Sequence, residues 1–409
     1  MEFKARYSVV VVGAGPAGST AAQILAKKGV DVLLVEKQRE VGKDIFCAEG
    51  ISRNTLKLAE EIFEIENPEK FIASRVNSVR IIGPDLETID VRHENMGVTL
   101  ERKIFDRTLA GIAAANGANL SVGTKFIQAE RKNGKVELTL MKEGKLFNVT
   151  SDIVIGADGP ASGVATSLGL PMETDDEEVH RCAQFFIYND RIVGNRLDFF
   201  FSEKYSPTGY AWVFPKGNGF ANVGLGVLTS SGKDPMEFLK SYISDFFPDS
   251  KIIGWLRGVV PIGGYNKRIY ADNLLVTGDA ARLADPVTGG GIGPAILSGK
   301  IAGEVAFEAL ERGDLSEKFL IKYEKIYWDR TGIDYKVSLI LKEYLKNYTD
   351  ERIIKLHRVL KKLFDGKDLE TISITRLFIN TVKVSKDLFG LFFGSGGDVL
   401  FNLRKIILR

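Results

Sequence analysis

Three glycines near the N-terminus have the spacing of a phosphate-binding turn. They stand in the run Gly13-Ala14-Gly15-Pro16-Ala17-Gly18, directly after the β-branched stretch of residues 7–12. In such a turn the first glycine allows a tight bend, the second lets backbone amides approach a pyrophosphate, and the third permits close helix packing. Glu36 follows 18 residues after Gly18, where a carboxylate accepts hydrogen bonds from an adenosine ribose. The N-terminus therefore predicts a dinucleotide site.

Two later turns each bring an aspartate to the end of an apolar run. The first is Gly156-Ala157-Asp158-Gly159, and the second is Gly278-Asp279. An aspartate placed at the carboxyl end of a strand, just before a helix, can bond a ribityl hydroxyl. The second turn leads into Asp285-Pro286-Val287-Thr288-Gly289-Gly290-Gly291-Ile292, where consecutive glycines would let a planar ring lie against the backbone.

The elements that must position these turns can be read from hydrophobic periodicity. Residues 7–12 and 32–35 read as buried parallel strands on either side of a helix over 16–28, which is one βαβ unit. A helix is predicted over 102–115. The aromatic-rich block 179–260 alternates like an antiparallel sheet. Beyond Gly289, amphipathic patterns predict four helices, at 295–311, 315–330, 336–347 and 350–364.

Composition excludes several classes of protein. A formal net charge of +2 over 409 residues is too balanced for a chain that mainly neutralises nucleic-acid phosphates. Two cysteines cannot hold a four-thiolate iron–sulfur cluster or build a disulfide framework. The three histidines lack metal-ligand spacing, so no metal site is predicted. No signal peptide or membrane-spanning run is visible, and a reducing, cytosolic setting is expected.

The order of the three turns resembles that of the flavoprotein hydroxylase superfamily, which binds FAD through an N-terminal fingerprint, an Asp-Gly motif and a Gly-Asp motif. Arg102 matches the position from which the superfamily's arginine reaches the flavin, although a solvated surface arginine is the alternative. The cofactor-binding residues that the resemblance implies are Gly13, Gly15, Pro16, Ala17, Gly18, Glu36, Lys37, Cys47, Ala48, Gly50, Arg102, Asp158, Gly278, Asp279, Pro286, Gly290, Gly291 and Ile292.

Two further motifs resemble the geranylgeranyl reductase family, in particular its archaeal branch. They are Tyr210-Ala211-Trp212-Val213-Phe214-Pro215 with the later Val223-Gly224-Leu225-Gly226, and Cys47-Ala48-Glu49-Gly50. The resemblance implies substrate contacts at Tyr210, Trp212, Phe214, Pro215 and Gly224, and catalytic roles in gating or proton delivery at Cys47, Glu49 and Tyr210. The plain alternatives are a core aromatic stack on one face of a strand and a small buried cysteine.

The family resemblance implies an FAD-dependent oxidoreductase that acts on CH-CH groups. It would saturate carbon–carbon double bonds of geranylgeranyl chains in archaeal membrane-lipid precursors, the digeranylgeranylglycerophospholipids. Its partners would be a polyprenyl lipid and an external electron donor, namely reduced ferredoxin, NAD(P)H or reduced deazaflavin. It would be cytoplasmic and peripheral on the inner face of the membrane. Residues 388–409 combine apolar and basic side chains suited to an anionic membrane, or form an ordinary helical core.

Three rival functions remain open at this point. The first is a monooxygenase or halogenase, which shares the fold and the FAD motifs. The second is an electron-transfer or quinone-reducing flavoprotein. The third is a non-catalytic FAD-dependent lipid carrier, which would bind the isoprenoid and leave it unchanged. The run after Asp158 lacks the arginine that superfamily hydroxylases usually carry there, which puts NAD(P)H recognition by this segment in doubt.

The sequence thus predicts an α/β protein with a Rossmann-type FAD-binding domain, an inserted antiparallel-sheet substrate domain and a C-terminal helical region. The predicted FAD-binding domain comprises residues 1–73, 101–170 and 270–310. The substrate domain comprises 74–100 and 171–269, and the helical domain 311–409.

Overall fold

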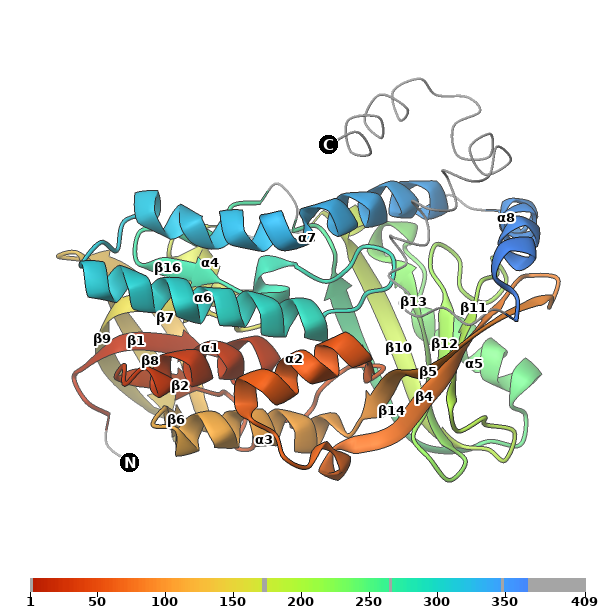
Figure 1. Ribbon diagram of the computed structural model, residues 1–409, viewed down its shortest axis with the longest axis horizontal. Helices are drawn as coiled ribbons and strands as arrows, with labels where there is room; N and C mark the ends of the chain where they lie inside the picture. The colour runs from red at the N-terminus through yellow and green to blue at the C-terminus, as the bar shows by residue number, and fades with distance from the viewer. Residues whose placement is uncertain (1–2, 171–174, 265–266, 347–348, 367–409) are drawn as a thin grey trace, which may run out of the picture.

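The computed structural model describes residues 3–170, 175–264, 267–346 and 349–366. In this part of the chain two eight-stranded sheets lie at opposite ends of an elongated molecule, as Figure 1 shows. The motifs described above fall mostly on the first sheet and on the segments that join it to the second. The predicted membrane segment 388–409 lies outside the described residues.

The first sheet is built around the predicted βαβ unit. Its parallel core has the order β16-β9-β1-β2-β6, so that β1 lies between β9 and β2, and β15 pairs antiparallel at one edge. Its strands are β1 (Arg6–Val12), β2 (Val32–Val35), β6 (Asn119–Ser121), β7 (Thr124–Lys132), β8 (Lys135–Lys142), β9 (Lys145–Gly156), β15 (Tyr270–Ala271) and β16 (Leu274–Val276). Both faces of the core strands are buried, which explains their uninterrupted apolar runs.

The second sheet has the order β14-β10-β13-β12-β11-β4-β5-β3. Its strands are β3 (Gly50–Ser52), β4 (Ile72–Ile82), β5 (Thr88–Leu100), β10 (Val179–Tyr188), β11 (Arg196–Phe200), β12 (Ala211–Pro215), β13 (Phe220–Leu228) and β14 (Lys251–Pro261). The pairs are antiparallel, as predicted, except that β11 and β4 run parallel. This pairing joins strands that are more than a hundred residues apart, which no local pattern could reveal.

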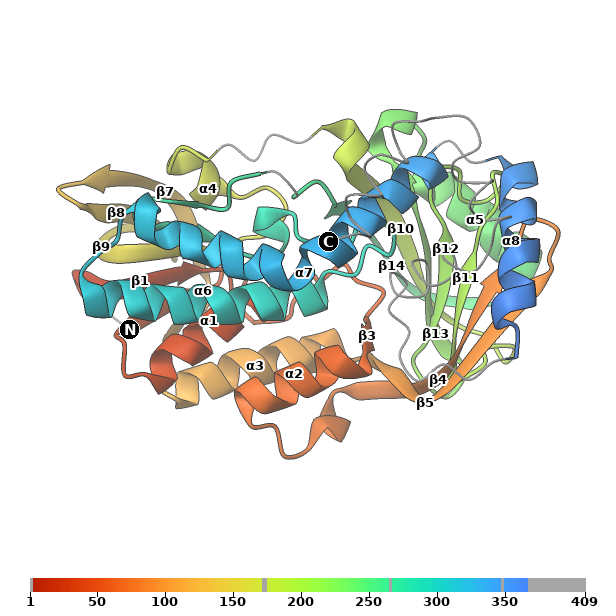
Figure 2. The ribbon, with the colours of Figure 1, turned by 45° about the horizontal axis from the view of Figure 1, so that its top comes forward.

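Eight α-helices are present in the described residues. They are α1 (Pro16–Lys27), α2 (Arg53–Phe63), α3 (Arg102–Ala115), α4 (Gly163–Ser167), α5 (Pro235–Phe246), α6 (Ile292–Arg312), α7 (Glu317–Lys346) and α8 (Asp350–Phe364). Figure 2 shows α6 and α7 side by side over the end of the molecule that contains the first sheet. Helix α1 packs against α6 because Gly299 leaves room for the carbonyl of Ala17, which would lie 2.2 Å from an added Cβ atom.

Three helices differ from the prediction, and one of them, α2, was not predicted at all. The patterns at 315–330 and 336–347 belong to one helix, α7, and two of its tyrosines, one in the first pattern and one in the predicted gap, bond to other parts of the chain. Tyr323 donates to the carbonyl of Val276, and Tyr335 donates to that of Ile262, each at 2.8 Å. Helix α5 was not predicted inside the strand-rich block. It begins at the Asp234 cap and buries Leu239 and Tyr242 against the second sheet.

Candidate active site

The turn after β1 uses its glycines in two different ways. Gly13 has a φ of +103°, and an added Cβ atom would lie 2.2 Å from the carbonyl oxygen of Ala157. At Gly18 the added atom would lie 1.8 Å from the carbonyl oxygen of Gly13. At Gly15, the N-cap of α1, it would meet nothing within 4 Å. The protein's own packing therefore requires Gly13 and Gly18, whereas Gly15 leaves open space in front of a helix N-terminus.

A second helix N-terminus converges on the same place. The added Cβ atom of Gly278 would lie 3.1 Å from Cβ of Ala17 in α1 and 3.4 Å from Cβ of Ala295 in α6. The first turns of both helices thus flank Gly278. Because helix N-termini carry partial positive charge and unpaired amides, this arrangement fits the pyrophosphate of FAD.

Asp279 lies beside the start of α6. Its Oδ1 atom is 3.0 Å from the position of an added Cβ atom on Gly291, the α6 N-cap. Burial raises the pKa of the Asp279 carboxyl above its ordinary value, and the charge of Arg102 opposes part of that rise. A buried acceptor at this point suits the ribityl hydroxyl that the sequence suggested.

The other two predicted acidic residues bond to nearby parts of the chain. Glu36 accepts from the backbone amides of Ala14 at 3.0 Å and Gln38 at 2.9 Å, so its carboxylate reaches the glycine turn. Lys37 is exposed beside it. Asp158 accepts from Ser162 Oγ at 2.6 Å and orders the start of α4. Burial raises the pKa of the Asp158 carboxyl.

Arg102 is buried at the start of α3, which excludes the solvated alternative. Its Nε and a terminal nitrogen donate to both carboxylate oxygens of Asp106, at 2.8 and 2.9 Å. This fork leaves the guanidinium close enough to Cys47 and Asp279 to influence the pKa of each. Arg102 therefore joins the cysteine segment to the Gly-Asp turn.

The glycine loop before α6 is held by Asp285. Its Oδ1 atom accepts from the amides of Val287 at 3.0 Å and Thr288 at 2.7 Å, and Ser338 Oγ in α7 donates to Oδ2 at 2.6 Å. Pro286 and Gly290 lie within the loop that these bonds fix, and Ile292 begins α6. The loop is thus a preformed surface at the junction of the two sheets.

Glu49 is the centre of an ion-pair network. Its φ of +73° is unusual for a residue with a side chain, which indicates a turn that other contacts must stabilise. Its Oε2 atom is paired with Lys216 Nζ and accepts from Asn222 Nδ2 at 2.9 Å. Its Oε1 atom accepts from the amide of Arg102 at 3.4 Å. The carboxylate therefore has three donors, and the side chain of Lys216 is only 5% exposed.

The neighbours of Glu49 tie the same segment to the second sheet. Gln184 in β10 donates to the carbonyl of Cys47 at 3.1 Å. An added Cβ atom on Gly50 would lie 2.5 Å from the ring of Phe214, so only glycine lets that ring close on the segment. Ala48 lies between these two fixed points, with its carbonyl near Asn222.

Of the three predicted catalytic side chains, two have their polar groups engaged. Glu49 is in the network above, and the hydroxyl of Tyr210 donates to the carbonyl of Thr288. The half-buried thiol of Cys47 only accepts, from the amide of Glu49 at 3.2 Å. Burial raises the pKa of Cys47, while Arg102 opposes part of the rise, so the thiol is protonated at neutral pH. Burial likewise raises the pKa of Tyr210.

Trp212 and Phe214 lie on one face of β12, as period-two alternation predicted, and Val213 lies on the other. They form an aromatic cluster with Cys182, against which Phe46 and Tyr210 pack. Trp212 Nε1 donates to Gln184 Oε1 at 3.2 Å. Two predicted residues support this cluster. Gly224 leaves room for the Trp212 ring, 2.4 Å from an added Cβ atom, and the Pro215 carbonyl accepts from Thr99.

Several side chains of this site were not predicted as site residues. Lys216 and Asn222 hold Glu49, Gln184 joins the cysteine segment to Trp212, and Asp106 fixes Arg102. Only Asp106 had a signal in the sequence, because i,i+4 pairs face each other on a helix. Gln184 and Asn222 come from strands of the second sheet and Lys216 from the turn after β12, and their partners lie far away in the chain.

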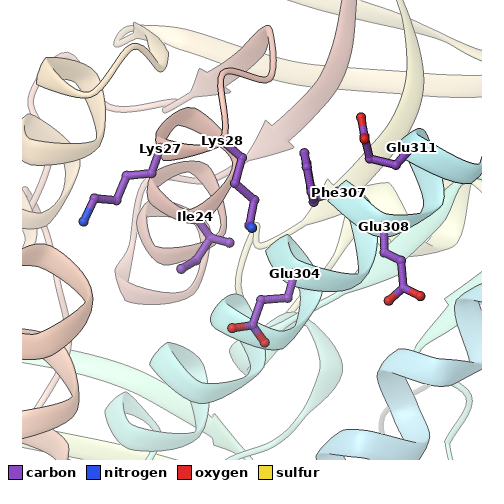
Figure 3. Close-up of a pocket in the computed structure, with 7 residues that line it drawn as sticks. All are labelled: Ile24, Lys27, Lys28, Glu304, Phe307, Glu308 and Glu311. Atoms are coloured by element: carbon purple, nitrogen blue, oxygen red, sulfur yellow. The ribbon is translucent and has the colours of Figure 1, made fainter.

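A separate hollow lies between the far ends of α1 and α6, and Figure 3 shows the side chains that line it: Ile24, Lys27, Lys28, Glu304, Phe307, Glu308 and Glu311. The site described above is at the N-termini of both helices. At 1.5 Å per residue, the hollow is roughly 15–20 Å away along the helix axes. It therefore does not belong to the candidate active site.

Among the described residues, no helix is both long and apolar enough to cross a membrane. In that same part of the chain, no group of three or more His, Cys, Asp or Glu side chains could hold a metal ion.

The fold and the site define an FAD-binding oxidoreductase with a second, mainly antiparallel sheet. Residues 6–185 match an FAD binding domain, and residues 178–260 match the geranylgeranyl reductase catalytic domain. The chain belongs to the digeranylgeranylglycerophospholipid reductase family. It is 41% identical to digeranylgeranylglycerophospholipid reductase 2 of Methanococcoides burtonii, over 95% of this chain and 97% of that protein.

Solved structures agree with this assignment. A geranylgeranyl bacteriochlorophyll reductase-like protein from Thermoplasma acidophilum superposes with a TM-score of 0.88 at 32% identity, covering 98% of this chain and 99% of that one. The myxobacterial chondrochloren halogenase superposes with a TM-score of 0.71 at 15% identity, covering 99% and 97%. The halogenase therefore shows that the fold is shared, whereas the reductase-like protein is similar in sequence as well.

Proposed function

We propose that this protein is an FAD-dependent reductase that saturates carbon–carbon double bonds in the geranylgeranyl chains of digeranylgeranylglycerophospholipids. One observation carries the proposal. Relatives named for this activity match the chain over nearly its whole length, including the region of the catalytic-domain match. Bound FAD supplies the redox chemistry, and the protein has to bind the geranylgeranyl chain, orient it and provide a proton.

The residues that would hold FAD fall into three groups. The helix N-termini beside Gly15 and Gly291 suit the pyrophosphate, and Glu36 suits the adenosine ribose. Asp279 suits the ribityl chain. The loop fixed by Asp285 provides the glycine surface against which the flavin ring would lie.

Cys47 is the proposed proton donor. A general acid must hold a proton at the working pH, and that proton must not be engaged in a hydrogen bond to a neighbouring protein group. The Cys47 thiol meets both conditions, since its pKa is raised by burial and its sulfur only accepts a hydrogen bond. Tyr210 donates its hydroxyl proton to Thr288, which favours a role in holding the glycine loop.

Glu49 is proposed as a positioning residue. Its ion pair with Lys216 and its bond from Asn222 hold a backbone conformation that a glutamate rarely adopts. That conformation places its amide on the sulfur of Cys47. The network would therefore act on the reaction through the position of Cys47.

The aromatic cluster around Trp212 and Phe214 is proposed to line the path of the isoprenoid chain. These rings face the cysteine segment, with Phe46 packed on the cluster. Flat apolar side chains exclude water and bind a flexible hydrocarbon without directional bonds.

The electron donor and the location are proposed from the resemblance. Reduced ferredoxin, NAD(P)H or reduced deazaflavin would reduce the bound FAD from outside the protein. The protein would be cytoplasmic and would contact the inner membrane face, where its lipid substrate lies.

The test is an anaerobic turnover. The purified protein is reduced with dithionite, a digeranylgeranylglyceryl phospholipid is added, and flavin absorbance is followed together with the mass of the lipid. We expect flavin reoxidation matched by hydrogen pairs gained on the chains. A flavin that stays reduced until oxygen is admitted would contradict the reductase and favour the monooxygenase that shares this fold.

A further inference from the structure

One edge of the second sheet is unusually apolar for a surface. Strand β14 is the terminal strand of that sheet, and its residues Ile252, Ile253, Trp255, Leu256 and Val259 are exposed. These are five of the twelve large apolar side chains that are exposed in the described part of the chain. Trp255 is 62% exposed. A long apolar edge strand left in water is an aggregation hazard, so such a surface normally has an occupant.

Both faces of β14 contribute to this apolar edge. Opposite residues in an antiparallel pair share a face, and Trp255 lies opposite Phe185 while Leu256 lies opposite Gln184. Leu256 is therefore on the face of the sheet that carries the active site, and Trp255 is on the other. The exposed apolar side chains therefore project from both faces of the sheet edge.

The shape of the strand argues against a second protein strand as the occupant. The register between β10 and β14 shifts at Phe186 and Ile187, so that Ile253 is an extra residue in β14. Bulges of this kind twist an edge away and hinder pairing with another chain. Pro261 ends the strand without an amide donor.

The apolar edge is continuous with the candidate active site. An added Cβ atom on Gly258 of β14 would lie 2.3 Å from the ring of Phe46, which is next to Cys47 in the chain. Further along, Cγ1 of Val260 is 3.6 Å from the corresponding position on Gly289, in the glycine loop. One strand thus runs from the exposed side chains to the two segments proposed to bind flavin and substrate.

We propose that the β14 edge, defined as Ile252, Ile253, Trp255, Leu256 and Val259, docks into the surface of a lipid bilayer. This inference rests on the proposed function, because a substrate whose chains lie in a bilayer has to leave it beside the active site. Phe46 packs over Gly258 of β14 and precedes Cys47 in the chain. A tryptophan among aliphatic side chains is typical of the membrane interface.

Apolar burial would drive this docking, with little help from charge. Arg257 is the one cation inside the strand, and both of its terminal nitrogens donate to the carboxylate of Asp234, at 2.8 and 3.0 Å. Lys251 stands at the strand's first position. Binding should therefore depend weakly on salt and on the fraction of anionic lipid, unlike binding through clustered basic residues.

The test uses the FAD-loaded full chain and vesicles of phosphatidylcholine, with and without phosphatidylglycerol. The variant Ile253→Glu/Trp255→Glu is compared with Leu146→Glu, since Leu146 is 65% exposed on β9 of the other sheet. We expect the double variant to lose vesicle partition by on the order of tenfold or more, and the control to be unchanged. Wild-type partition should persist at high salt.

A second measurement does not depend on charged variants. Vesicles of brominated phosphatidylcholine should quench part of the tryptophan fluorescence of the wild type, and this part should be absent in Trp255→Phe. Quenching equal in both proteins would overturn the proposal. So would salt-sensitive binding that the double variant retains, or a dimer that the double variant splits without loss of vesicle binding, which would assign the edge to a second copy.

Activity separates this inference from the proposed function. The double variant should reduce substrate dispersed in detergent at the wild-type rate, and lose activity only on substrate embedded in vesicles. Equal loss on both would place Trp255 and Ile253 in the reaction and contradict a docking role. A wild type that is inactive on both forms of the lipid would instead contradict the proposed function, while vesicle binding would still test the edge.

Discussion

The candidate active site has one end proposed to bind the cofactor and another proposed to bind the substrate, and the two ends are built from different groups. At the cofactor end, recognition depends on backbone: glycines, helix N-termini and a loop held by Asp285. At the substrate end it depends on side chains, because Glu49, Lys216, Asn222 and Gln184 meet from four separate segments. The first end depends on glycines, which have no side chain and so allow close packing of the backbone. The second depends on every side chain of its network being present.

This difference decides how each end should fail. Adding one methyl group to the cofactor end produces either a clash or a blocked site, depending on which glycine changes. Removing one group from the substrate end leaves a buried partner unpaired. The following variants test that contrast, beginning with the largest expected effect.

Gly18→Val should abolish the folded, FAD-containing protein, since even its Cβ atom would lie 1.8 Å from the Gly13 carbonyl oxygen. Gly15→Ala is the matched variant, because its Cβ atom meets no protein atom within 4 Å. We expect Gly15→Ala to fold with an unchanged thermal midpoint for the FAD-free protein but to bind FAD more weakly. Flavin absorbance per protein and thermal unfolding measure both. Equal behaviour of the two variants would contradict the division of roles among these glycines.

Cys47→Ala should lower the rate of double-bond reduction by about 10²–10⁴-fold, the usual contribution of a general acid, while FAD binding is retained. Single-turnover flavin reoxidation with the lipid measures this. For the wild type, the rate should fall only as pH rises through the thiol pKa, which burial places above its ordinary value. Tyr210→Phe serves as the control. If Tyr210→Phe removes the alkaline fall and Cys47→Ala keeps it, the proton comes from the tyrosine.

Lys216→Met should destabilise the protein by about 3 kcal/mol, because it leaves the Glu49 carboxylate largely buried without its cation. Adding Glu49→Gln should restore part of that loss, since the charge is then gone. Urea unfolding of the two single variants and the double variant gives the coupling energy. Additive effects would mean that the ion pair contributes nothing to stability. The rate should also fall in Lys216→Met if the network positions Cys47.

Trp212→Phe should have the smallest effect, about 1 kcal/mol, from loss of the bond that Nε1 donates to Gln184. The phenylalanine ring keeps an aromatic side chain in the cluster, although it fills only part of the space that the indole occupies beside Gly224. We expect a KM for the lipid raised by a few-fold and a nearly unchanged kcat. Gln184→Leu removes the same bond from the other side and also frees the Cys47 carbonyl. Gln184→Leu should therefore lower kcat as well. Equal effects of the two variants on kcat and KM would mean that the hydrogen bond from Gln184 to the Cys47 carbonyl has no separate role.

The same contrast explains how much could be predicted. The glycine turn, the helix beginning at Pro16 and the helix over 102–115 were readable because each is specified by neighbours within a few turns of chain. The patterns at 315–330 and 336–347 predict two helices, yet the structure forms one. Its tyrosines bond to Val276 and Ile262, contacts that lie outside any local window.

For the candidate site, residue type and motif order indicated Cys47, Glu49, Tyr210 and the aromatic residues, but not how they divide the work. The family resemblance implied gating or proton delivery for Glu49 as well as for Cys47. Its pairing with Lys216, 167 residues away, gives it a different proposed role. No spacing rule connects two residues that meet only when separate strands are assembled.

The sequence by itself determined where a dinucleotide can lie against this chain, because a glycine-rich turn between a strand and a helix is a local structure with local requirements. Only the tertiary structure decided which side chains surround Cys47, that β4 pairs parallel with β11, and that the apolar strand β14 stands at an edge. These depend on contacts between distant segments. Their stability comes from burial that exists only after the two sheets have formed.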